Sequence, residues 1–278
     1  MNGSSLVSVI IPVFNDAEQL QIALSSVQSQ NIENLEIILV DDASKTPLLQ
    51  SDYPNAIVHN HSKNLGAAAA RNTGLSYASG KYIAFLDSDD RWDKGKLKIQ
   101  VNILAEAPQE VAGVFTPFYY EDTPDKLYNS TLNPSDWFGH FLQGCRVAPG
   151  STLLFRRTVL DEIGLQDEEL RRFQDWDWLL RVAQKYSFTL ASEARVILGS
   201  PSRPNSNLFN RSVQEIGDKW LPKLTKTQGA KLRATLQIER SAHAKQNGRF
   251  FLAIKHGIAA GLIHPKTLVA NLLWKYLR

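Results

Sequence analysis

Two apolar runs on either side of a helix-like segment constrain the fold of this chain most strongly. Val7–Phe14 (VSVIIPVF) and Glu36–Val40 (EIILV) are short and rich in β-branched residues, as buried strands are. Between them, residues 16–30 place apolar side chains at helical spacing. Pro12 has no N–H to give to a sheet, so we expect the first strand to end near it. A strand, a helix and a strand joined by short links predict an α/β fold with a mostly parallel central sheet.

A further buried-strand candidate, Tyr82–Leu86, runs directly into the carboxylates Asp87, Asp89 and Asp90. Open α/β sheets bind ligands at the carboxyl ends of their strands. Carboxylates this close repel one another, and a divalent cation that carries a phosphorylated ligand would relieve the repulsion. These residues alone leave two interpretations open, a metal and phosphate site or a solvated acidic turn.

A possible phosphate contact follows the short strand expected at Ala56–His59. Gly66 stands where an alanine-rich helix should begin, and a helix N-terminus attracts phosphate. Arg71, one turn further on, could add a bidentate contact. For an arginine taken alone, a solvated surface role is the more common one. His59 and His61 are assigned no ligand role.

The second half of the chain changes character. Val111–Tyr120 and Ser151–Phe155 are predicted strands, whereas residues 121–150 are polar and contain several prolines, which predicts loops that could close over a site. A helix is expected from Gln174, with Asp175 in its first turn, where the helix dipole favours a carboxylate whether or not it reacts.

From about Arg211 the periodicity is helical throughout. The last helix mixes Trp274 and Tyr276 with Lys275 and Arg278. Contact with an anionic membrane face and packing on the chain's own domain or a dimer partner both remain open. We therefore expect a C-terminal helical appendage.

Composition excludes several classes of protein. The net charge of +3 over 278 residues is too small to indicate nucleic-acid binding. A single cysteine, Cys145, excludes a disulfide framework and favours a reducing, cytoplasmic compartment. We expect no signal peptide at Met1–Ser5 and no transmembrane helix, because no apolar run approaches ~18 residues. No Cys and His residues have the spacing of zinc ligands.

Five motifs occur in a fixed order: Val7–Asn15 (VSVIIPVFN), Ile38–Ser44 (ILVDDAS), Asn64–Gly74 (NLGAAAARNTG), Tyr82–Asp90 (YIAFLDSDD) and Gln174–Arg181 (QDWDWLLR). Together they resemble the family 2 glycosyltransferases, over about residues 6–200. The resemblance implies a GT-A fold, a Rossmann-like α/β/α sandwich. It also implies transfer of a sugar, with inversion, from a nucleotide-diphosphate sugar that is typically UDP-linked. Enzymes of this size with helical tails resemble those that build bacterial surface polysaccharides on lipid carriers.

The resemblance assigns roles to particular side chains. The nucleotide sugar is expected to contact Pro12, Phe14, Asn15, Asp42, Arg71 and Asp87. Within this set, Asp42 is expected to hydrogen-bond the base and Asp87 to lie toward the ribose. Asp89 is implied as a ligand of Mn²⁺ or Mg²⁺, and Asp175 as the general base.

Three departures from the family pattern are visible. Gln174 replaces the glutamate that usually precedes the catalytic aspartate, and Gly164–Glu168 lacks the usual phenylalanine. The loop Ser202–Ser206 lacks the usual histidine, so a metal-ligand or lid role for Arg203 stays open.

We therefore expect a catalytic domain over residues 1–210, made of a nucleotide-sugar half (1–111) and an acceptor half (112–210), followed by a helical region over 211–278. The expected partners are the sugar donor and a glycan or lipid-linked acceptor, with peripheral membrane contact at the inner face and self-association left open. One alternative is a sugar-nucleotide nucleotidyltransferase, which would carry a glycine-rich loop where Pro12–Asn15 stand. A second is a catalytically inactive sugar-nucleotide-binding protein.

Overall fold

The structure is a computed structural model that describes residues 6–199 and 205–276, with side chains as far as residue 273. The chain forms two compact units. The first unit comprises residues 1–133, 147–168 and 181–200, and the second comprises residues 134–146, 169–180 and 201–278.

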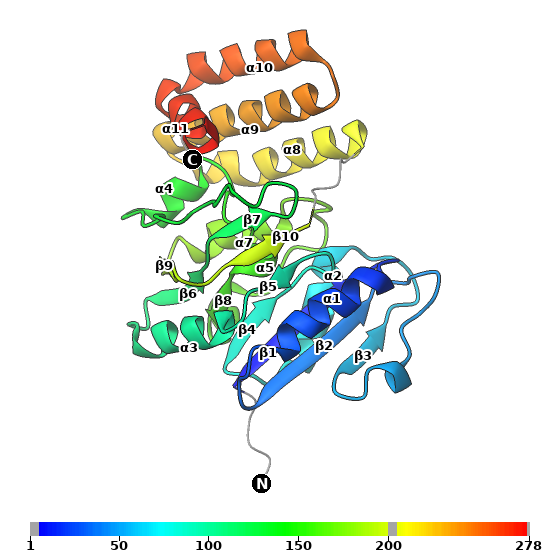
Figure 1. Cartoon of the computed structure of the whole chain (residues 1–278). Helices are drawn as coiled ribbons and strands as arrows, with labels where there is room; N and C mark the ends of the chain where they lie inside the picture. The colour runs from blue at the N-terminus through cyan, green and yellow to red at the C-terminus, as the bar shows by residue number, and fades with distance from the viewer. Residues whose placement is uncertain (1–5, 200–204, 277–278) are drawn as a thin grey trace. The chain divides into compact units, whose positions relative to one another are not determined.

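A seven-stranded sheet forms the core of the first unit (Figure 1). Its strands lie in the order β3 (Ile57–Asn60), β2 (Leu35–Asp41), β1 (Val7–Val13), β4 (Tyr82–Phe85), β8 (Leu154–Arg156), β6 (Val111–Phe115) and β9 (Ser187–Leu190). The pairs among β3, β2, β1 and β4 are parallel, and only β8 runs antiparallel to its neighbours. The predicted α/β class with a mostly parallel sheet is confirmed.

Pro12 stands near the end of β1, where it fits the pairing pattern. The contact of β1 with β4 ends at Ile10, while its contact with β2 continues to Val13. The missing N–H of Pro12 is therefore tolerated on a strand that has lost one neighbour.

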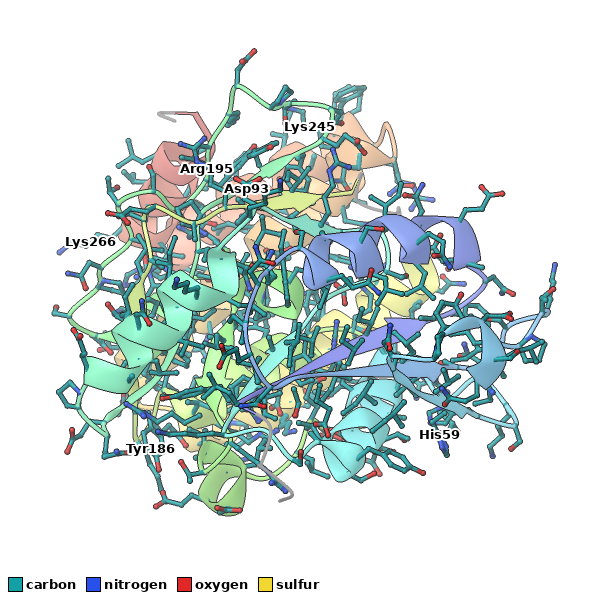
Figure 2. The ribbon with its side chains drawn as sticks, turned by 60° about the horizontal axis from the view of Figure 1, so that its bottom comes forward. His59, Asp93, Tyr186, Arg195, Lys245 and Lys266 are labelled. Carbon is teal, nitrogen blue, oxygen red and sulfur yellow. The ribbon has the colours of Figure 1, made fainter. Side chains whose placement is uncertain are left out.

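Helices α1 (Ala17–Gln28) and α2 (Ala67–Tyr77) cover opposite faces of this sheet (Figures 1 and 2). Helix α1 buries Leu20, Ala23, Leu24 and Val27, the residues expected from their spacing. Helix α3 (Lys96–Glu106) packs near β6 and β8. The remaining helical segments of this unit are short: η1 (Gln50–Asp52), α5 (Pro149–Thr152) and α6 (Val159–Ile163).

A smaller sheet joins three strands in the order β5 (Arg91–Trp92), β10 (Val196–Leu198) and β7 (Phe118–Tyr120). Two expectations from the sequence are wrong. Val111–Tyr120 is two strands that belong to different sheets, and the residues 151–152 that were expected in a strand lie in helix α5. Pro149 at the first position of α5 suits a helix start better than a strand.

The second unit is helical. It contains α4 (Trp137–Phe141), the start of α7 (Gln174–Val182), α8 (Ser206–Trp220), η2 (Leu221–Lys223), α9 (Lys226–Gln246), α10 (Phe250–Ile263) and α11 (Pro265–Tyr276). The helical run thus begins at Ser206, where the Asn205 side chain accepts a hydrogen bond from Asn207 N and caps α8. Trp176 and Trp178 are buried in the core, as expected of helix residues.

Candidate functional site

The carboxyl ends of β2, β1 and β4 gather the polar residues that the sequence singles out. Asp42 follows β2, Asn15 follows β1, and Asp87 follows β4. These three strands are neighbours and parallel, so their carboxyl ends meet at one edge of the sheet. Three of the residues that were expected to contact the nucleotide sugar therefore lie along one edge of the sheet.

Asp42 is buried and holds the segment that leads into α2. Its Oδ1 accepts a hydrogen bond from Leu65 N (2.8 Å), and its Oδ2 accepts one from Gly66 N (2.7 Å). Nδ1 of His61 lies 2.8 Å from Asp42 Oδ1, and Nε2 of His61 lies 2.9 Å from Thr73 Oγ1. Three of about four acceptor positions of this carboxylate are thus in use. Gly66 has φ 97°, a conformation that a side chain would strain.

Residues just before and after Asp42 form the loop that borders a cavity beside it. Asp41 accepts hydrogen bonds from Ser44 N (2.9 Å) and Leu48 N (3.1 Å), which closes the loop after β2. Asn15 bridges to the same loop, since its N donates to Ser44 Oγ and its Oδ1 accepts from Lys45 N, both at 2.8 Å. A cavity of about 540 Å³ opens here. It is lined by Val13, Asn15, Asp16, Ala17, Glu18, Gln19, Ser44, Lys45, Thr46 and Leu48.

Phe14 and Pro12, two more of the residues expected at the nucleotide, differ in exposure. Phe14 leaves 49% of its surface exposed, enough to offer a ring face to a ligand. Pro12 is partly buried within β1 and does not line the cavity. Of the residues expected to bind the nucleotide sugar, Asn15 lines this cavity.

Arg71 and Asp87 form a close ion pair. Arg71 Nη2 donates to Asp87 Oδ1 at 2.6 Å, and the guanidinium lies over the Phe85 ring, 5.6 Å from its centroid. Gly150 borders this pair closely, because a Cβ there would come within 2.7 Å of Asp87 Oδ2. Arg71 thus offsets the negative charge of Asp87. The charge of Asp89 is not offset by this pair, so a cation would stabilise Asp89 more than Asp87.

Burial raises the pKa of Asp89 above its ordinary value, and the nearby charge of Asp87 raises it further. Burial, followed by the charge of Asp87, raises the pKa of Asp90 to about 8. Hydrogen bonds from Ser151 Oγ and Gly199 N to Asp90 act in the opposite direction. Asp90 therefore serves to hold the acidic turn together.

The residues present fit a divalent cation. Among residues 6–199 and 205–276, no three His, Cys, Asp or Glu side chains form a ligand set on their own. Ions such as Mg²⁺ need only one or two protein carboxylates when phosphate oxygens complete the shell. A cation beside Asp87 and Asp89 would relieve the repulsion that raises the pKa of Asp89.

Asp175 belongs to the second unit, at the start of α7. Its Oδ1 accepts a hydrogen bond from the N–H of Trp176 at 2.7 Å, and the preceding Phe173 has φ 64°. The N-terminal end of a helix favours an ionised carboxylate. Arg203 lies outside the described residues.

Sequence reasoning missed several residues that support this edge. His61 contacts Asp42, although its position after a strand gave no sign of that role. Ser151 joins two acids, because its Oγ accepts a hydrogen bond from Asp87 N (3.1 Å) and donates to Asp90 Oδ2. Trp92 Nε1 donates to Ser151 O (2.8 Å) and fixes the same segment. Of these contacts, only those made to Asp90 had any signal in the sequence, which is the position of Asp90 next to Asp89.

Comparison with known proteins agrees with these observations. The family model described as "Glycosyl transferase family 2" matches residues 8–164. An uncharacterized glycosyltransferase of Rickettsia felis is 31% identical over 88% of this chain, and this chain spans 43% of that protein's length. The Escherichia coli protein WfgD, described as a UDP-Glc:alpha-D-GlcNAc-diphosphoundecaprenol beta-1,3-glucosyltransferase, is 39% identical over 36% of this chain and 41% of its own length.

Solved structures show the same fold. The Staphylococcus aureus protein TarS, residues 1–349 in complex with UDP, superposes with a TM-score of 0.63 at 21% identity. The match covers 87% of this chain and 74% of that one.

Proposed function

Because this chain belongs to glycosyltransferase family 2, we propose that it transfers a sugar from a nucleotide-diphosphate sugar, with UDP as the carrier, to a hydroxyl group of a glycan or lipid-linked acceptor. The observation that carries the proposal is the shared sheet edge, which brings Asp42, the Arg71–Asp87 pair and Asp89 to the carboxyl ends of neighbouring parallel strands. The names of two similar proteins support the donor and acceptor classes, since one was crystallised with UDP and the other acts on a diphosphoundecaprenol-linked sugar.

The nucleotide is proposed to bind along the loops after β1 and β2. Asp42 Oδ2 accepts one bond from Gly66 N, so this oxygen retains an acceptor position for an N–H of the base. The exposed ring of Phe14 offers a surface on which the base can stack. This arrangement favours a base that donates a hydrogen bond from its ring nitrogen, as uracil does.

Asp89, in the same turn as the Arg71–Asp87 pair, is proposed to hold Mn²⁺ or Mg²⁺ together with the diphosphate, while Asp87 is proposed to lie toward the ribose. When bound, such an ion acts as a Lewis acid that stabilises negative charge on phosphate oxygens. Arg71 is fixed by Asp87 and keeps a positive charge at the same place. Gly150 leaves room for this pair, because a side chain there would collide with Asp87.

We propose a single displacement with Asp175 as the proton acceptor. The acceptor oxygen forms a bond to the anomeric carbon while the bond from that carbon to the diphosphate oxygen breaks. The nucleoside diphosphate leaves with the electron pair, and the acceptor's proton passes to the Asp175 carboxylate. Attack from the face opposite the leaving group inverts the anomeric configuration, through a transition state like that of glycoside hydrolysis.

A thermal-shift panel of nucleoside diphosphates and their sugars, with and without Mn²⁺, tests the donor. We expect uridine compounds to raise the melting temperature most, and Mn²⁺ to increase the shift. Asp42→Asn should lose the preference among bases, whereas Asp52→Asn, an exposed change on η1, should keep it. A larger shift with a guanosine or thymidine diphosphate sugar would refute the UDP assignment.

A further inference from the structure

Helix α10 has an unusual distribution of side chains, because its small residues face inward. Its buried residues are Ala253 and Ala260, and Gly257 lies on the same side, where a Cβ would be 3.7 Å from Ser241 Oγ of α9. Figure 1 shows α10 alongside α9, which separates it from α8. Small side chains therefore make part of the contact between α9 and α10, together with the pair of His256 Nδ1 and Gln237 Oε1 (2.7 Å), and most of the large apolar side chains of α10 are left exposed.

Many of the exposed side chains of α10 and α11 are large and apolar, and together we call them the apolar face. On α10 it comprises Phe250, Phe251, Ile254, Ile258 and Leu262, and on α11 it comprises Val269, Leu272 and Leu273. Phe251 exposes 91% of its surface and Leu262 exposes 82%. Four of the α10 residues follow one another at intervals of four, so they lie along one side of the helix. Exposed apolar surface of this extent on a folded domain indicates a binding site.

The chain segment that carries the apolar face contains charges of one sign. Residues 240–278 contain four lysines, three arginines and no aspartate or glutamate, a net charge of +7. The rest of the chain therefore carries 3 − 7 = −4. Within the described part of the chain, five of these cations form no ion pair: Arg240, Lys245, Arg249, Lys255 and Lys266. Lys245 and Lys266 come from different helices and lie well apart (Figure 2), so the charge is spread over the surface.

From these observations we propose that α10 and α11 bind the chain to the surface of a bilayer that contains anionic lipid. The apolar face would enter the boundary between headgroups and acyl chains, while the lysines and arginines beside it contact lipid phosphates. In this arrangement the helices would lie along the bilayer surface. Within residues 6–199 and 205–276, none of the helices combines the length and the hydropathy that a membrane span needs.

Charge decides between a bilayer and a second copy of this chain. In a two-fold dimer built on the apolar face, the unpaired cations of one copy would approach those of the other, and no acidic residue of this region would offset them. Anionic lipids supply the missing opposite charge. The membrane assignment rests on the second unit alone and does not depend on the sugar donor.

Vesicle flotation of the whole chain tests the proposal directly. Vesicles of phosphatidylcholine with about 30% phosphatidylglycerol should carry the protein upward, and pure phosphatidylcholine should carry at least about tenfold less. Raising the salt to about 0.5 M should release much of the bound protein, because the charge contribution is screened.

Two sets of substitutions separate the apolar and electrostatic parts. Phe251→Ser with Leu262→Ser should lower the partition coefficient at least about tenfold, since both side chains are exposed and leave the fold unchanged. Lys245→Gln, Lys255→Gln and Lys266→Gln together should lower it about a hundredfold, at about fivefold for each charge. Leu49→Ser and Lys98→Gln, exposed changes in the first unit, are the matched controls and should bind as the wild type does.

Sedimentation velocity without lipid supplies the opposing outcome. A wild-type dimer that Phe251→Ser with Leu262→Ser converts to a monomer would overturn the proposal and assign the apolar face to self-association. Equal flotation of the wild type and both variant sets would overturn it as well. These readouts require no sugar transfer, so failure of the proposed reaction would leave their meaning intact.

Discussion

At the scale of single residues, Lys96 is the most unusual side chain. It is fully buried at the start of α3, and its Nζ has no hydrogen-bond partner within the described residues. Burial lowers its pKa well below the ordinary value, although the Trp92 ring, 3.9 Å from Nζ, offers the positive charge some compensation. A buried polar group without a partner lowers stability.

Lys96→Met should therefore raise the free energy of unfolding at neutral pH by about 1 to 3 kcal/mol, because it removes this buried group at similar volume. The unfolded chain binds the Lys96 proton up to its ordinary pKa, whereas the folded chain releases it at lower pH. Wild-type stability should thus rise with pH between these two values, and the variant should lose that rise.

Urea denaturation at several pH values measures both effects of Lys96→Met. Lys98→Met, an exposed change on the same helix, is the control and should stay within about 0.5 kcal/mol of the wild type. Destabilisation by Lys96→Met would show that the amine has a structural role.

Asp175 provides the residue-scale test of the mechanism. Asp175→Asn keeps the size of the side chain but cannot accept a proton, so transfer should fall by about 10² to 10⁴. Nucleotide affinity, measured by calorimetry with UDP, should change less than about twofold, because the proposed role concerns the acceptor alone. Transfer at the wild-type rate would remove Asp175 from the mechanism.

At the scale of elements, the strands of the parallel sheet were predictable because each buried run carries its own signal. Val7–Val13 and Leu35–Asp41 are mostly apolar, and local composition decides their conformation. Strand β5 has only two residues and exists through pairing with β10, about a hundred residues later, so no local pattern reveals it. Helix α5 was also not predicted, because the β-branched and aromatic residues after Pro149 favour a strand, whereas Pro149 starts a short helix.

Some parts of the candidate site could be predicted from the sequence and others could not. The acids after β2 and β4 were predictable, because a polar cluster that follows a buried strand marks a sheet edge. The contacts that hold those acids were not, since His61 and Ser151 meet them through turns whose shape depends on distant residues. Membrane contact was considered for the last helix alone, and the exposed side of α10 was not predicted, because hydrophobic spacing does not say which side of a helix is covered.

Asp177 ties α7 to α8 within the second unit. It is fully buried, accepts a hydrogen bond from Trp220 Nε1 (2.9 Å), and pairs with Lys219 Nζ (3.0 Å). Asp177→Ala should cost about 3 kcal/mol of unfolding free energy, because it removes the acceptor of the buried indole N–H and breaks the ion pair with Lys219. Asp218→Ala, an exposed neighbour on α8, should change stability by less than about 0.5 kcal/mol in the same thermal or urea unfolding experiment.

At the scale of the whole molecule, charge is unevenly distributed along the chain. Residues 1–239 carry a net charge of −4, whereas residues 240–278 carry +7. The acidic part contains Asp87 and Asp89, where the proposed cation binds, and the basic part contains the apolar face. Electrostatic attraction to a divalent cation and to anionic lipid can therefore be tested separately.

Removal of divalent metal should abolish transfer. After exhaustive treatment with EDTA we expect activity at background, restored by Mn²⁺ or Mg²⁺, because the Asp89 carboxylate repels a diphosphate that no cation accompanies. Asp89→Asn should need at least about tenfold more metal for half-maximal activity, while flotation with anionic vesicles should be unaffected by either change. Undiminished transfer after chelation would contradict the metal assignment.

The bonds of Asp42 also bear on how a nucleotide would be received. Leu65 N and Gly66 N already donate to this carboxylate in the folded chain, so the turn into α2 is ordered before a nucleotide binds. Binding should therefore cost this turn little further conformational entropy. Amide protons of these two residues should consequently exchange slowly with deuterated solvent before any nucleotide is added. Saturation with UDP should slow that exchange only slightly, as expected of a binding site that is preorganised in the free protein.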